Sequence, residues 1–261
     1  GLAYVDITTS EFATSQFPIG ELDLELARLS PAEVLIGDDY DDTAPDGAVV
    51  TTLDPDAFDL EWDRDMLLDH FEVASLEAFG CEGLPLATKA AGAIVDYLGR
   101  NQKAALSQVT TLYTYSTSAY MVLDPQTRRN LELFQAGRWG EATSSLFSVL
   151  DRTKTPMGGR LLRRWLGQPL LDVAELVRRL DAVAWSLRSA LRRERVVSLL
   201  KSVSDIERLA NRVRGGTATP RDLVTLALSL EVAPDLKAIL MEDDDSDQVA
   251  WLASDIREND E

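Results

Sequence analysis

The stretch TPMGGRLLRRWLGQPLLD (residues 155–172) shows how the second half of the chain is built. Its first threonine can cap a helix that starts at the following proline, and a glycine and a proline near its end stop that helix. On a helical wheel the large apolar side chains cover one half and three arginines the other. The stretch therefore predicts a packing helix over 156–166 with a basic solvent face. Gly158 lies in the apolar half, where we expect a neighbouring helix to come close.

Two glycines beside arginines would also suit a phosphate-binding loop. Such a loop needs its glycines before the helix and a Lys-Ser or Lys-Thr pair at the helix start. Gly158 and Gly159 instead lie inside the expected helix, and no GxxxxGK[ST] pattern occurs in the sequence. We therefore expect a packing role for this helix.

Other helix starts in this half carry the same signature of a capping side chain before a proline, at Asp124-Pro125 and Thr219-Pro220. Asp172 and Ser204 are further candidate caps. We expect helices over 125–136, 143–151, 156–166, 173–189, 190–202, 205–214, 220–231, 234–241 and 247–257. The segment 109–123 is rich in residues that favour strands and is expected to supply one or two of them.

The first half mixes strand and helix patterns. Two strand-like runs joined by a three-residue TTS connection predict a hairpin. Asp54 can cap a helix that begins at Pro55, and Phe58, Trp62 and Met66 can share its buried face. The expected strands are 2–7, 11–17, 34–36 and 48–53, and the other expected helices are 22–29 and 84–101. This order predicts a mixed sheet with helices packed against it.

Charge divides the chain of 261 residues, whose formal net charge is −18. Residues 1–107 hold 5 Lys+Arg against 22 Asp+Glu, residues 108–235 hold 19 against 13, and residues 236–261 hold 2 against 9. We therefore place a domain boundary near 107 and expect domains over 1–107 and 108–261. The acidic first domain should repel nucleic acid at ordinary salt.

Lysine is scarce, with 5 Lys against 21 Arg, and aspartates crowd the surface-type segments. This composition is typical of proteins from salt-loving organisms, in which high ionic strength screens the repulsion between like charges. An acidic interaction tail or loop is the alternative. We favour the salt-adapted interpretation because the acidic excess runs through the whole first domain, and we expect the source to be a halophilic archaeon.

Few residues offer reactive chemistry. The single cysteine, Cys81, allows no internal disulfide, and together with the single histidine, His70, it cannot form a structural zinc site. We expect Cys81 to be an unreactive loop residue and His70 a partly exposed surface histidine. No apolar run is long enough to cross a bilayer, and the single cysteine favours a reduced, intracellular setting, so we expect a cytoplasmic protein. Because the sequence opens on a strand pattern, we expect it to be part of a longer chain.

Asp6 ends the first strand, the position at which ribonuclease-H-like nucleases hold a divalent metal. Glu72, Glu77 and Asp96 are conceivable partners. The alternative is a surface aspartate that closes the hairpin. We favour this alternative, because 22 acidic residues in the first domain make chance carboxylates common.

Arginines recur on the helices of the second domain, in the groups Arg160/Arg163/Arg164, Arg178/Arg179, Arg192/Arg193/Arg195 and Arg208/Arg212/Arg214. Such basic faces are one mark of nucleic-acid binding. Most of these arginines have acidic residues close by in sequence, and no interleaved aromatics accompany them. We therefore expect solvated faces and salt bridges between helices.

Several stretches resemble the MutS family of DNA mismatch-recognition proteins. In the second half these are MVLDPQTRRNLELF (121–134), SLFSVLDRTKTPMGGRLLRRWLGQPLLD (145–172), RRLDAV (178–183), SDIERLANRV (204–213) and TATPRDLVTL (217–226). In the first half they are GLAYVDITTSEF (1–12) and LARLSPAEVLI (26–36). The resemblance implies an α/β, ribonuclease-H-like connector domain over 1–107. The N-terminal part of a mostly α-helical lever, or core, domain follows over 108–261.

The resemblance also implies what the parent protein does. Such a parent binds mismatched duplex DNA, binds and hydrolyses ATP with Mg²⁺, forms a homodimer, recruits MutL and is expected to be associated with the nucleoid. This chain matches none of the mismatch-reading, clamp or ATPase domains, so we expect no enzyme activity and no catalytic, cofactor or metal residues in it. Its expected role is to couple mismatch binding to the ATPase and clamp and to offer a surface to MutL.

Two other functions stay open from the sequence. One is a metal-dependent nuclease that uses Asp6, for which Mg²⁺-dependent cleavage lost in Asp6→Asn would be the sign. The other is a helical scaffold unrelated to repair. Within the resemblance, branches of the family that lack the mismatch-reading domain are also compatible with this chain.

Salt should stabilise the fold. We expect the free energy of unfolding to rise between low and molar KCl, because ions screen the repulsion among the acids of residues 1–107. Circular dichroism during denaturation at several KCl concentrations measures this change. A fold indifferent to salt would contradict the salt-adapted interpretation.

Overall fold

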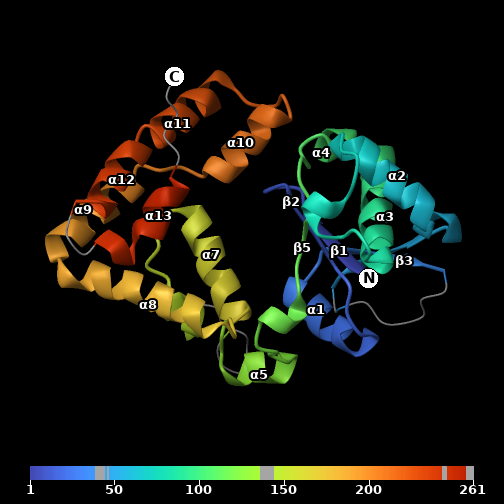
Figure 1. The fold of residues 1–261 in the computed structure, drawn as a ribbon, viewed down its shortest axis with the longest axis horizontal. Coiled ribbons are helices and arrows are strands. Elements are labelled where there is room, and N and C mark those ends of the chain that lie inside the picture. The colour runs from blue at the N-terminus through green and yellow to red at the C-terminus, as the bar shows by residue number, and fades with distance from the viewer. Residues whose placement is uncertain (39–44, 46, 136–143, 243–245, 257–261) are drawn as a thin grey trace. The chain divides into compact units, whose positions relative to one another are not determined.

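A computed structural model describes residues 1–261 apart from 39–44, 46, 136–143, 243–245 and 257–261. The fold divides into two compact units, Gly1–Thr127 and Arg128–Glu261. We call them the first and the second unit. Figure 1 shows strands and helices mixed in the first unit and helices alone in the described part of the second.

The strands of the first unit form two separate sheets. Strands β1 (Leu2–Asp6) and β2 (Glu11–Ser15) make the expected antiparallel hairpin, and β5 (Tyr113–Thr114) pairs with β2 in parallel. Strands β3 (Glu33–Gly37) and β4 (Val49–Leu53) form a second, parallel sheet. The β1-β2-β5 sheet is mixed, as expected, but it does not include β3 and β4, because no ladder joins them to β1 among the described residues.

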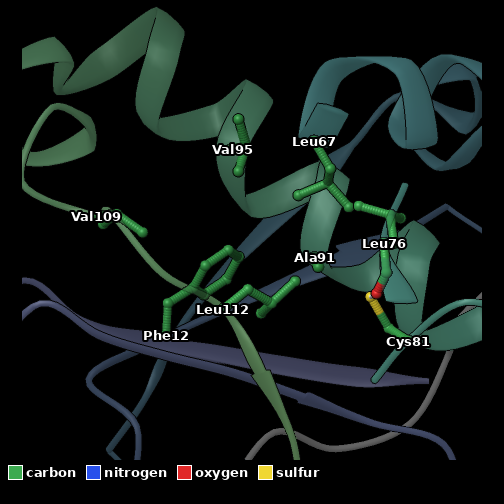
Figure 2. Packing of buried hydrophobic residues seen from close by; sticks show 8 residues of the cluster. All are labelled: Phe12, Leu67, Leu76, Cys81, Ala91, Val95, Val109 and Leu112. Carbon is green, nitrogen blue, oxygen red and sulfur yellow. Dashed lines mark hydrogen bonds between the residues drawn. The ribbon is translucent and has the colours of Figure 1, made fainter. Parts of the chain in front are cut away.

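Helices α1 (Leu22–Leu29), α2 (Leu60–Phe71), α3 (Pro85–Asn101) and α4 (Lys103–Leu106) complete the first unit. Its core joins side chains from α2, α3, β2 and the connecting loops, as Figure 2 shows for Leu67, Ala91 and Phe12. Burying such large apolar side chains contributes roughly 1.5–3 kcal/mol each to folding. The core therefore holds the β1-β2-β5 sheet against α2 and α3.

Helix α2 departs from the sequence expectation. Pro55–Phe58 forms a separate 3-10 turn, and Asp54 makes no side-chain cap. The capping residue is Asp59, whose carboxylate accepts a hydrogen bond from the Trp62 backbone N–H. Because the helix starts later, its buried positions are Asp63 and Leu67. Trp62, expected inside, is 62% exposed.

The division between the units does not coincide with the change in charge near 107. Residues 113–114 form β5, which belongs to the first sheet through its pairing with β2. The first unit therefore extends to Thr127, beyond the charge boundary. The density of charged residues reflects the surface of a unit, whereas the unit boundary depends on which strands pair.

The second unit begins within α5 (Pro125–Asn130) and is helical in its described part. Trp185, Ile239 and Val249 form its buried cluster. The further helices are α6 (Leu146–Leu150), α7 (Pro156–Gly167), α8 (Val173–Arg188), α9 (Ala190–Leu200), α10 (Ile206–Arg214), α11 (Pro220–Leu230), α12 (Ala233–Leu240) and α13 (Ala250–Asp255). The ends of the helices expected over 125–136, 143–151 and 247–257 reach residues outside the described part of the chain.

Most of the caps expected from the sequence are present. The Thr155, Asp172 and Thr219 side chains accept hydrogen bonds from the first turns of α7, α8 and α11. The α10 cap is Asp205 rather than Ser204, whose backbone N–H instead donates to Ser229 Oγ.

Gly158 does not receive a neighbouring helix. A Cβ at this position would lie 3.1 Å from Thr155 Oγ1 and 3.4 Å from Thr153 Cβ. The segment that leads into α7 therefore fills the space, because it folds back over the first turn of the helix.

Glycine is needed at one position in α3. A Cβ on Gly92 would lie 2.3 Å from Asp63 Cβ on α2, too close for any rotamer change to relieve. We expect Gly92→Ala to lower the free energy of unfolding by about 1–3 kcal/mol, since α2 would have to move. Urea denaturation of the whole chain measures this loss.

Gly99→Ala on the same helix is the matched control, because a Cβ at Gly99 would lie 3.5 Å from Leu106 Cδ2, an ordinary van der Waals distance. Replacing a helical glycine by alanine there should raise stability by about 0.5–1 kcal/mol. Equal effects of the two substitutions would contradict a specific close approach at Gly92.

Candidate functional site

Asp6 closes the β1–β2 hairpin. One of its carboxylate oxygens accepts hydrogen bonds from the Thr8 backbone N–H at 2.8 Å and the Thr8 hydroxyl at 2.7 Å. The Thr9 backbone N–H donates a longer hydrogen bond, of 3.4 Å, to the same oxygen. Partial burial raises the pKa of the Asp6 carboxyl, but these hydrogen bonds outweigh burial and the net pKa is lowered. The structure thus confirms the turn-forming role of Asp6.

The other acids considered as metal ligands have separate roles. Asp96 forms an ion pair with Arg100 at 2.7 Å, Glu72 follows the end of α2, and Glu77 begins a 3-10 turn. Among the described residues no group of three or more His, Cys, Asp and Glu could hold a metal ion. The nuclease hypothesis therefore finds no support in the geometry.

Neither His70 nor Cys81 resembles a catalytic residue. His70 is half-buried, and its Nε2 lies 2.8 Å from the Val109 carbonyl oxygen. Cys81 is buried in the core, and burial raises the pKa of its thiol. A thiol that is buried and protonated is a poor nucleophile.

Arg160 links two helices of the second unit. It lies on α7, and its Nη1 and Nη2 donate to the two carboxylate oxygens of Asp205 at 2.8 and 2.7 Å. Its Nη2 also donates to Glu207 on α10 at 2.6 Å. Hydrogen bonds from Arg160 are the main reason that the pKa of the Asp205 carboxyl is lowered. Because Asp205 also caps α10, one carboxylate fixes the start of α10 against α7.

Arginines on α8 link that helix to two others. Glu175 forms ion pairs with both Arg178 and Arg179. The Arg178 guanidinium lies 4.5 Å from the Trp251 ring centroid on α13. The Arg179 guanidinium lies 3.8 Å from the centroid of the Trp165 ring on α7. Planar guanidinium groups stack well on aromatic rings. The ion pairs with Glu175 therefore hold both arginines in position for their contacts with the tryptophan rings.

The remaining arginine groups are also largely engaged within the second unit. Arg195 pairs with Glu242 at 2.5 Å, and Arg212 on α10 pairs with Asp222 on α11 at 2.8 Å. Arg192 is buried, with its guanidinium against Trp185. The expected salt bridges between helices are therefore confirmed. These contacts leave fewer of the basic side chains available for phosphates.

One unusual residue escaped the sequence analysis. The Asp63 side chain is fully buried between α2 and α3, and neither carboxylate oxygen has a hydrogen-bond partner among the described residues. Burial, reinforced by the charges of Asp59 and Asp96, raises the pKa of the Asp63 carboxyl to about 7. The spacing of Asp63 and Leu67 along α2 was the available signal, because positions four apart share a helix face.

Comparison with known proteins identifies both units. A family model described as MutS domain II matches residues 1–110. A second, described as MutS domain III, matches residues 126–260. The chain belongs to the MutS family. The two matches follow the order of the units, and the domain III match begins within α5.

Curated relatives in this family carry the name DNA mismatch repair protein MutS. The protein from Dehalococcoides mccartyi is 44% identical over 233 residues, which cover 88% of this chain and 27% of the relative. The protein from Synechococcus elongatus is 43% identical over 258 residues, covering 92% of this chain and 29% of the relative. The chain thus spans less than a third of the length of these MutS relatives. Both relatives are bacterial, so they give no support to an archaeal source.

No helix in the described part of this MutS-family chain is long and apolar enough to cross a membrane.

Ionisation of Asp63 should destabilise the first unit. In the folded chain the carboxyl has a pKa of about 7, against about 3.8 when it is exposed. The folded state therefore binds the proton more tightly. The stabilisation of the folded state by this bound proton is complete at low pH, and it is lost as the pH rises through about 7. We expect Asp63→Asn, which cannot ionise, to be more stable than the parent chain at pH 8 by roughly 1–4 kcal/mol.

Urea denaturation between pH 5 and pH 8 measures this difference, which should shrink towards pH 5. Asp65→Asn is the matched control, because Asp65 lies on the same helix and is exposed. A pH-independent difference between Asp63→Asn and the parent chain would contradict a titrating Asp63.

Proposed function

We propose that this chain is the connector and the first part of the lever of a MutS-type mismatch repair protein. The observation that carries the proposal is the consecutive match to MutS domains II and III over almost the whole chain. In the parent protein this segment would couple mismatch binding to the ATPase and clamp. It would contribute no catalytic residue itself.

The contacts within the second unit support a mechanical role. Arg160 joins α7 to α10, and the Glu175-centred stacks join α8 to α7 and α13. Helices joined by such directional contacts can move as one body, which is the property required of an element that transmits a conformational change.

The wider properties of the parent are part of the same proposal. They are binding of mismatched DNA, binding of ATP with Mg²⁺, homodimer formation and recruitment of MutL through the first unit. A ribonuclease-H-like connector fold and a salt-adapted, archaeal host also belong here, the latter supported by the acidic composition. The nuclease alternative is not favoured, since Asp6 is held by the hairpin turn.

The recruiting surface can be tested directly. The chain would be titrated with the N-terminal domain of MutL from the same organism by calorimetry, at the lowest KCl concentration at which the chain is folded. We expect saturable binding. Neutralising exposed acids of the first unit, at Glu61, Asp65, Glu72 and Glu77, should weaken it, because charge complementarity guides such encounters.

A matched control neutralises four exposed acids of the second unit, at Asp181, Glu194, Glu231 and Asp235. Binding should be unaffected by this change. An absence of binding to the folded chain, or equal losses in both variants, would refute a MutL surface on the first unit.

A further inference from the structure

Asp63 occupies a notch between α2 and α3 that exists because residue 92 has no side chain. A Cβ at Gly92 would lie 2.6 Å from both Cγ and Oδ1 of Asp63, so the carboxyl group takes the space that a side chain would fill. The Asp63 side chain is fully buried, and neither of its oxygens has a hydrogen-bond partner among the described residues. Because buried polar groups are nearly always paired, this carboxyl group is an exception that needs a physical explanation.

The Gly92 notch suits the carboxyl group only in its neutral form. An ionised carboxylate that is cut off from water and has no hydrogen-bond donor is strongly destabilised. Burial is accordingly the main cause that raises the pKa of Asp63 to about 7. The side chain therefore changes its charge near neutral pH.

The acids that face Asp63 come from both helices. On α2, Asp59 lies one turn earlier and caps the helix. On α3, Asp96 forms an ion pair with Arg100 at 2.7 Å. Both aspartates raise the pKa of Asp63. The 3-10 turn before α2, which packs on α3, adds Asp56, and this side chain is exposed. None of these acids can take up the charge of an ionised Asp63.

Lys89 is the positively charged group that acts on Asp63, and it lowers the pKa of that carboxyl. It lies on α3 three residues before Gly92, so the two positions share a face of the helix. Lys89 is half-buried, and in the described part of the chain it forms no ion pair. An ionised Asp63 that left the Gly92 notch would therefore have a partner within one helical turn.

Helix α2 is anchored unevenly against the rest of the first unit. In its C-terminal half, Leu67 packs in the core cluster with Ala91 of α3, as Figure 2 shows. In its N-terminal half Asp63 is the buried side chain, and Trp62 is 62% exposed. Segments with few buried apolar contacts open locally at the lowest free energy. The N-terminal half of α2 can thus separate from α3 while the core stays closed.

We propose that Asp63 is a pH-dependent switch between α2 and α3. When it is protonated, Asp63 occupies the Gly92 notch and keeps the two helices in contact. When it loses its proton to water, it leaves the notch and pairs with Lys89, and the N-terminal half of α2 opens away from α3. Each protonation state thus favours one of two arrangements of the same helix.

The switch itself does not depend on the proposed function. Helix α2 also carries Glu61 and Asp65, two of the exposed acids whose neutralisation should weaken MutL binding. Opening of α2 would alter the surface on which these acids lie. That consequence alone rests on the proposed function.

Amide hydrogen exchange of the whole chain between pH 5 and pH 8 tests the switch. For the amides of residues 63–66, the observed rate divided by the intrinsic rate gives the equilibrium constant of opening. We expect this constant to rise by up to about tenfold per pH unit from pH 5 and to level off above about pH 7, because opening releases one proton. It should exceed at every pH the opening constant of the Phe12 amide, which lies in the core.

Three variants assign the titrating group and its partner. Asp63→Asn cannot ionise, so the opening constant of residues 63–66 should become independent of pH. Asp65→Asn, on the exposed side of the same helix, is the matched control and should keep the pH dependence of the parent chain. Lys89→Gln should lower the opening constant at pH 8 about two- to fivefold, because the open state loses an ion pair. If Lys89 acted only on the closed state, its loss would raise opening instead.

Three results would overturn the proposal. Equal opening constants for residues 63–66 and Phe12 at every pH would show that α2 opens only when the whole unit unfolds. A pH dependence that persists in Asp63→Asn would place the titrating group elsewhere. Faster opening of Lys89→Gln at pH 8 would exclude the ion pair in the open state. None of these results bears on MutL recruitment, which is tested separately.

Discussion

The close approach of α2 and α3 is the contact on which the first unit depends. Gly92 leaves no side chain between the helices, so Asp63 and its neighbours on α2 lie directly against α3. This approach brings Leu67 and Ala91 into one cluster with Phe12 of β2. The same closeness excludes water from the Asp63 carboxyl. Tight packing and a raised pKa therefore have a single geometric cause.

The second unit is held together differently. Its buried cluster of Trp185, Ile239 and Val249 is small, and much of the joining between helices is done by arginines. A bidentate contact such as that of Arg160 with Asp205 fixes direction as well as distance. Such a contact keeps the two helices from rotating about one another, which a contact that fixes only distance would not do.

Local chemistry made the helices of the second unit predictable from sequence. A capping side chain followed by proline predicted the starts of α7 and α11, and both are confirmed. The same rule failed for α2, because Asp54 and Asp59 lie five residues apart and Asp59 caps the longer helix. Local patterns cannot decide between two caps that close together.

Non-local features could not be read from the sequence. The strand patterns of β1 and β3 were evident, but which edges pair depends on how distant segments meet. Asp63 is similar, because its spacing from Leu67 indicates only a shared helix face, whereas its burial depends on the position of Gly92 on another helix. The turn role of Asp6 was predictable because its partners, Thr8 and Thr9, are adjacent in the chain.

The arginine contacts of the second unit make its stability respond to ionic strength differently from that of the first unit. Stacked and bidentate contacts act over a few ångströms, well inside the screening distance of about 8 Å at physiological salt. The surplus negative charge of the first unit acts over longer distances, where ions screen it effectively. Lowering the ionic strength would therefore weaken the packing of the first unit more than that of the second.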